Sequence, residues 1–84
     1  MPVPEAEVRE LLAAIREALS PPEPASHEGR RARSELVEVR AAYITGTLAP
    51  TVKGTAPMDL ATDARIIREY AARPLPYEPE GGES

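Results

Sequence analysis

The chain has 84 residues, a formal net charge of −4 and no cysteine. This length allows one domain at most, and domains of about 60 to 80 residues lie near the lower limit for folding alone. The lack of cysteine excludes disulfide bonds, and the acidic balance disfavours nonspecific binding to nucleic acid. Neither a secretion signal nor the roughly 18 continuous apolar residues of a membrane span is evident. We therefore expect a soluble, cytoplasmic protein.

The composition also resembles that of thermophilic proteins. Asparagine and glutamine are absent, and nine arginines accompany a single lysine, Lys53. Depletion of thermolabile residues, with proline in the loops, is typical of proteins that work at high temperature. A GC-rich coding sequence would also favour Ala, Arg, Pro and Gly, so the composition is compatible with both explanations.

Ten prolines divide the chain into three proline-free stretches, at residues 5–20, 25–49 and 58–73. Each stretch carries apolar residues at helical spacing, which predicts an all-α protein. We expect a helical domain over residues 1–73, with helices at about 4–20, 27–48 and 58–73. A Pro-rich connector would join the first two helices, and residues 74–84 would form an extended, partly disordered tail.

The first predicted helix begins where Pro4 suits a first turn, and it ends before Pro21 and Pro22. Glu5 and Glu7 place negative charge at its N-terminus, where the helix dipole favours it. Its apolar residues recur every three or four positions and predict one buried stripe: Val8, Leu11, Leu12, Ile15, Ala18 and Leu19.

The second predicted helix follows a short, stiff proline connector, with Ser26 as its N-cap. Its apolar residues form two adjacent rows, one of Leu36, Val39 and Tyr43 and the other of Val37, Ala41, Ile44 and Leu48. This wide face predicts packing against two neighbours. Gly46 and two threonines weaken helix formation, so whether the helix continues past Gly46 is open. Residues 49–57 are expected to form a loop.

The third predicted helix has Thr55 or Asp59 as its cap and a buried face formed by Leu60, Ala64, Ile67 and Ala71, broadened by Ile66 and Tyr70. The tail that follows is rich in proline and acid but carries one apolar and one aromatic anchor, Leu75 and Tyr77. We expect these two side chains to contact another chain. The tail also fits the R-x-x-P-x-x-P pattern of groove ligands, which proline-rich sequences often match by chance.

Catalytic chemistry finds little support, because an activated nucleophile or a tuned acid needs partners. His27 is the only histidine, and it lies at a predicted helix start, where we expect it to be exposed. The carboxylate pairs Glu35/Glu38 and Asp59/Asp63 are typical of solvated helix faces. We expect no enzyme activity, no cofactor and no bound metal.

One local basic cluster, Arg30, Arg31 and Arg33 with Arg40 further along, could contact an anion or nucleic acid. The acidic chain as a whole disfavours this interpretation. The connector between the second and third helices is also too long for the turn of about three to four residues in a helix-turn-helix. We therefore do not expect nucleic acid as a partner.

The sequence predicts a small, non-enzymatic protein-protein interaction or assembly module. Its few large apolar residues would form a thin core, which another chain could complete. The module would self-associate to form a homo-oligomer, or it would dock on a larger protein partner. The expected contacts are Leu36, Val39, Tyr43, Tyr70, Leu75 and Tyr77. Two alternatives are an antitoxin-like regulator that binds DNA and a protein, and a structural component of a phage or other large assembly.

Overall fold

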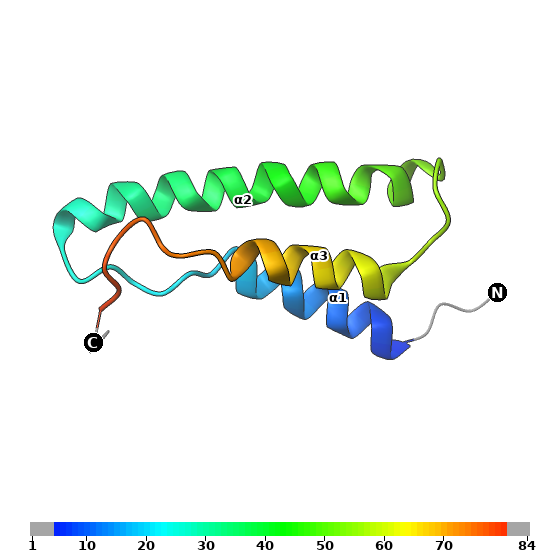
Figure 1. Ribbon diagram of the computed structural model, residues 1–84, viewed down its shortest axis with the longest axis horizontal. Coiled ribbons are helices and arrows are strands. Elements are labelled where there is room, and N and C mark those ends of the chain that lie inside the picture. Colours follow the sequence, from blue (N-terminus) through cyan, green and yellow to red (C-terminus); the bar gives the residue numbers. More distant parts are fainter. Residues whose placement is uncertain (1–4, 81–84) are drawn as a thin grey trace.

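A computed structural model describes residues 5–80 of the chain. It contains three helices, α1 (Glu5–Ala18), α2 (His27–Lys53) and α3 (Leu60–Ala71), and no strand among these residues. The predicted all-α class is confirmed. Helix α2 runs antiparallel to α1 and α3, so α1 and α3 are parallel to each other (Figure 1).

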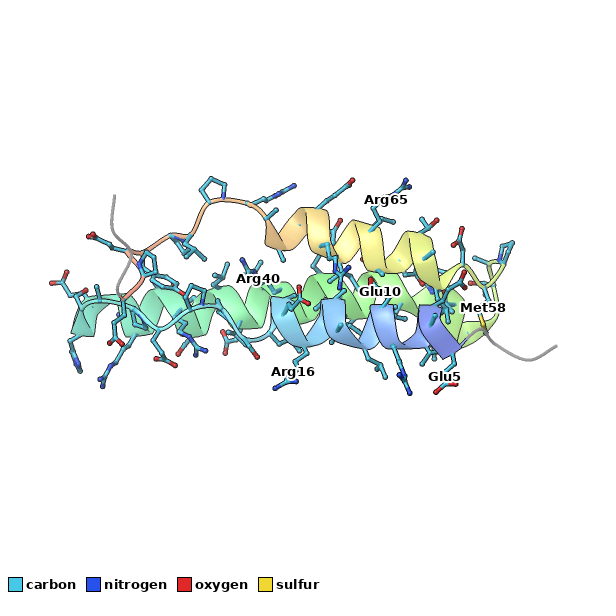
Figure 2. The ribbon with its side chains drawn as sticks, turned by 90° about the horizontal axis from the view of Figure 1, so that it is seen from below. Glu5, Glu10, Arg16, Arg40, Met58 and Arg65 are labelled. Carbon is cyan, nitrogen blue, oxygen red and sulfur yellow. The ribbon has the colours of Figure 1, made fainter. Side chains whose placement is uncertain are left out.

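The helices form two layers, with α2 in one and the α1–α3 pair in the other. Figure 1 shows α1 and α3 both on the same side of α2, and Figure 2, from below, shows them side by side. The α1–α3 contact is the most extensive between any two helices. Its buried surface is rich in alanine, which lets the two backbones approach closely. The buried apolar residues are Ala14, Ala18, Ile44, Leu60, Ala64 and Ile67.

Several of the large apolar residues lie outside this small core. Leu11 and Ile15 of α1, and Leu19 directly after it, are only partly buried where they pack against the core, and Leu12 is 59% exposed. On α3, the predicted buried face is confirmed, with Leu60, Ala64 and Ile67 buried and Ala71 packed beside them. The core is therefore thin, as the composition predicts.

Side chains cap the N-termini of α2 and α3. Ser26 precedes α2 and accepts a hydrogen bond at Oγ from the backbone N–H of Gly29 (3.3 Å). Asp59 precedes α3 and accepts from the N–H of Thr62 (3.0 Å). Both caps satisfy donors that the first turn of a helix leaves free. The predicted cap at Ser26 is confirmed, and Asp59 rather than Thr55 caps α3.

Helix α2 continues past the predicted end at residue 48 and includes Pro50, ending at Lys53. Its end is fixed by Gly54, whose φ of 73° is left-handed. The N–H of Gly54 bonds the carbonyl of Thr51, and the N–H of Thr55 bonds that of Pro50. This is the Schellman arrangement, which satisfies the last carbonyls of a helix. The last turn is also held to α3, because Thr51 Oγ1 donates to Asp63 Oδ2 (3.1 Å).

The connector and the first part of the tail lie side by side beneath the N-terminal half of α2. The N–H of Ala25 bonds the carbonyl of Glu78 (2.8 Å), and the N–H of Glu80 bonds that of Glu23 (2.6 Å). Pro24 and Pro79 form an isolated antiparallel bridge. Residues 74–80 thus fold back on the connector, while the remainder of the predicted tail, 81–84, and the predicted first-turn Pro4 are outside the described residues.

A buried arginine joins the three helices. Arg40 of α2 is only 4% exposed. Its Nη1 donates to the carbonyl of Ala18 and its Nη2 to that of Ala71, both at 3.0 Å. Ala18 and Ala71 are the last residues of the parallel helices α1 and α3. The guanidinium therefore neutralises two negative helix ends that would otherwise repel each other.

Candidate protein-binding surface

Two tyrosines stack at the junction of α2 and α3. The ring centroids of Tyr43 and Tyr70 are 3.8 Å apart, and their planes are within 5° of parallel. The Cζ of Arg73 lies 4.6 Å from the centroid of Tyr70. Because Tyr43 covers one face of that ring, the guanidinium takes the other. The tyrosine stack and this cation–π contact hold the side chains of Tyr43, Tyr70 and Arg73 together at the surface.

Apolar residues of α2 lie between these tyrosines and the tail. Leu36 and Val39 line a shallow groove of about 210 Å³ together with Pro76 of the tail. Val39 is 52% exposed and Tyr43 is 38% exposed, and they are one helical turn apart on α2. We call Leu36, Val39, Tyr43, Tyr70 and Pro76 the aromatic surface. The structure thus brings together four of the six predicted contact residues: Leu36, Val39, Tyr43 and Tyr70.

The other two predicted contacts, Leu75 and Tyr77, face the chain's own connector. Leu75 is half-buried and lines a cavity with Pro21 and Pro22. Tyr77 donates its hydroxyl hydrogen bond to the carbonyl of Pro22. These two side chains hold the tail against the connector, so within residues 5–80 they contribute to the fold.

A segment in the C-terminal half of α2 lacks charge on every side. Residues 41–52, AAYITGTLAPTV, contain no charged side chain, and the helix then ends at Lys53. A helix packed on one side normally carries charged residues on the opposite side. Here the solvent-exposed positions of the segment are instead Ala42, Tyr43, Thr45, Gly46, Pro50 and Val52. Val52 is 80% exposed. Figure 1 shows α1 and α3 both on one side of α2, so the opposite side of α2 has no neighbouring helix. Tyr43 stacks on Tyr70 of α3 at the edge of this exposed side.

Two of the three arginines in the predicted basic cluster contact groups of the same chain. Arg33 donates to the carbonyl of Pro21 (3.1 Å) and lies 3.8 Å from a carboxylate oxygen of Glu23. Arg31 pairs with Glu35 one turn later. Arg30 is exposed. It lies three residues before Arg33 on a shared side of the helix, whereas Arg31 lies about 100° around the helix from it.

Catalytic and metal-binding groups do not converge in the described part of the chain. His27 is exposed at the start of α2. No group of three or more His, Cys, Asp or Glu side chains among residues 5–80 could hold a metal ion. The pKa of Asp59 is lowered by hydrogen bonds from the side chain and the backbone of Thr62, and Arg65 adds a smaller effect. This is the signature of a helix cap.

A groove of about 530 Å³ lies between α1 and α3 and is lined by no residue of α2. Four alanines line it, Ala6, Ala61, Ala64 and Ala72, among the charged residues Glu7, Glu10, Arg65, Arg68 and Glu69. Arg68 pairs with Glu10 across the groove (2.6 Å). The groove contains none of the predicted contact residues, and the sequence pattern did not reveal it.

No protein-family model matches the chain, and no curated protein or solved structure shows significant similarity to it. Among the described residues, no helix has both the length and the apolar character needed to cross a bilayer.

Proposed function

We propose that this chain is a non-enzymatic assembly module of the cytoplasm, which binds protein through the aromatic surface and the exposed side of α2. The observation that carries the proposal is the uncharged segment 41–52, which exposes Tyr43, Gly46 and Val52 on a helix that is packed on one side. An exposed apolar area of this kind marks an interaction site more often than a solvated face.

The thin core supports the same function. Ile67 is the largest fully buried side chain among the described residues. Small domains without disulfides or a structural metal often depend on another chain for part of their stability. Binding of a partner over α2 would bury Val39 and Tyr43, which the chain leaves exposed.

The antitoxin-like alternative has weaker support. It needs Arg30, Arg31 and Arg33 to be available to phosphates, whereas Arg31 and Arg33 already pair with carboxylates of the same chain. No specific observation favours a phage component over another assembly module.

Photo-crosslinking tests the proposal. A photoreactive amino acid replaces Tyr43 in the full chain, and a matched protein carries it at Arg65, an exposed position on α3 that lines the α1–α3 groove. Both are produced in the native cells, and the adducts are identified by mass spectrometry. We expect position 43 to give one defined adduct, with a second copy or with another protein. Absence of adducts, or the same adducts from both positions, would contradict the proposal.

A further inference from the structure

Residues on the outer side of α2 repeat with the spacing of a helix-packing seam. Val39, Ala42, Gly46 and Ala49 follow one another at intervals of three or four residues, as do the a and d positions of a coiled coil. The series is extended by Glu35 at one end and by Lys53 at the other. Apart from these two ends, the seam is apolar and mostly small.

The middle of the seam is open to a neighbouring backbone. A methyl group built on Gly46 would meet no atom within 4 Å. Ala42 and Gly46 are exposed and Ala49 is half-buried. Small side chains permit two helices to approach to about 8 Å, the lower end of the usual range. The outer side of α2 therefore fits another helix better than it fits an irregular segment.

The charges near the seam indicate that the helix packed on it is α2 of a second copy. Glu38, beside the seam, and Lys53, at its end, form no ion pair within residues 5–80. They lie on opposite sides of Gly46 along the helix, at nearly equal distances. If two copies of α2 packed antiparallel, with the two-fold axis beside Gly46, Lys53 of each copy would lie next to Glu38 of the other. Parallel packing would place each charge against itself.

We infer that the chain forms a symmetric dimer in which the two α2 helices pack antiparallel about Gly46. The contact is isologous, as a two-fold interface requires. Ala42 of one copy lies against Ala49 of the other, and the two Gly46 residues face each other at the axis. This inference rests on the proposed function and names its partner, a second copy of the chain.

Single cysteines test the geometry, because the natural chain contains none. The Gly46→Cys protein places two thiols at the two-fold axis, where air oxidation joins them. Glu28→Cys is the control, since it lies on the same side of α2 but its two copies would be more than about 50 Å apart, at 1.5 Å per residue. We expect the disulfide-linked dimer to form at least about tenfold faster at position 46. Equal rates at the two positions would overturn the inference.

Charge reversal tests the orientation. We expect Lys53→Glu and Glu38→Lys each to weaken the dimer by roughly tenfold in Kd, and the double variant to return to within about twofold of the natural chain. A double variant as weak as its parents would overturn the antiparallel arrangement. A chain that is monomeric at every concentration would also overturn the antiparallel dimer. In that case a photo-crosslinked adduct of position 43 with a different protein would still support the proposed function.

Discussion

Arg40 donates a hydrogen bond from Nη1 to the carbonyl of Ala18, at 3.0 Å, at the end of α1. Its Nη2 reaches the end of α3 in the same way. The parallel packing of α1 and α3 brings two helix C-termini together, and one planar guanidinium can serve both because its donors are fixed in a fork. Arg40 thus connects the two layers of the fold.

We expect Arg40→Met to lower the free energy of unfolding by about 2–4 kcal/mol, because it leaves the carbonyls of Ala18 and Ala71 without their donor. Urea unfolding followed by circular dichroism measures the change. Arg31→Met is the control: the side chain of Arg31 is 90% exposed, so its change should stay within about 0.5 kcal/mol. A loss as small for Arg40 as for Arg31 would contradict the role of Arg40.

Replacing two glycines of α2 by alanine should change the free energy of unfolding in opposite directions. A Cβ at Gly29 would lie 2.6 Å from the Cβ of Pro24, so Gly29→Ala should push the connector away and cost about 1–3 kcal/mol. Gly46 has open space, and Gly46→Ala should stabilise the monomer by up to about 1 kcal/mol through helix propensity. Urea unfolding at concentrations low enough to keep the chain monomeric measures both. Destabilisation by both changes would contradict the prediction.

The end of α2 depends on the left-handed conformation of Gly54. We expect Gly54→Ala to cost about 1–2 kcal/mol, because an L-residue with a Cβ is strained at a φ of 73°. Gly54→Asn should cost less, since asparagine tolerates this region. Thermal unfolding of the three proteins gives the order Gly, Asn, Ala in decreasing melting temperature. If Ala matched Gly, the Schellman end would not contribute to stability.

The cap at Asp59 makes stability depend on pH. Hydrogen bonds from Thr62 lower the pKa of Asp59 in the folded chain. The contribution of ionised Asp59 to the free energy of unfolding is therefore fully present above its unfolded pKa of about 3.9. It is lost as the pH falls through the lower pKa of the folded chain. Asp59→Asn keeps a good cap that does not titrate. The stability advantage of the natural chain over this variant should shrink below about pH 4, in urea unfolding at several pH values. An advantage that grew there would contradict the assignment.

Helical periodicity predicted the buried face of α3, because Leu60, Ala64 and Ile67 follow the 3.6-residue repeat. It also placed Tyr43 and Tyr70 on wide apolar faces, although their stacking depends on how α2 and α3 pack. Each local pattern identifies one surface of one helix. Which surfaces meet is decided by tertiary packing.

The role of Arg40 was missed because arginine is rarely buried without a partner, and its partners here are main-chain carbonyls. A signal was present: Arg40 lies one turn before Ile44 and so on the same side of the helix. The predicted end of α2 at residue 48 is wrong, because Gly46 and the two threonines do not end the helix, which continues through Pro50 to Lys53. The usable signal was Gly54 directly after Lys53, a combination typical of a helix C-terminus.

Light scattering of the purified chain over a dilution series tests the central claim, that the exposed side of α2 is an assembly surface for a second copy. Val39→Glu is measured in parallel, since it puts a charge in the seam without touching the buried core. We predict a mass of twice 9.1 kDa at high concentration that falls on dilution, and a Val39→Glu protein that remains monomeric throughout. A mass of 9.1 kDa at every concentration, or a dimer that Val39→Glu leaves unchanged, would contradict the account.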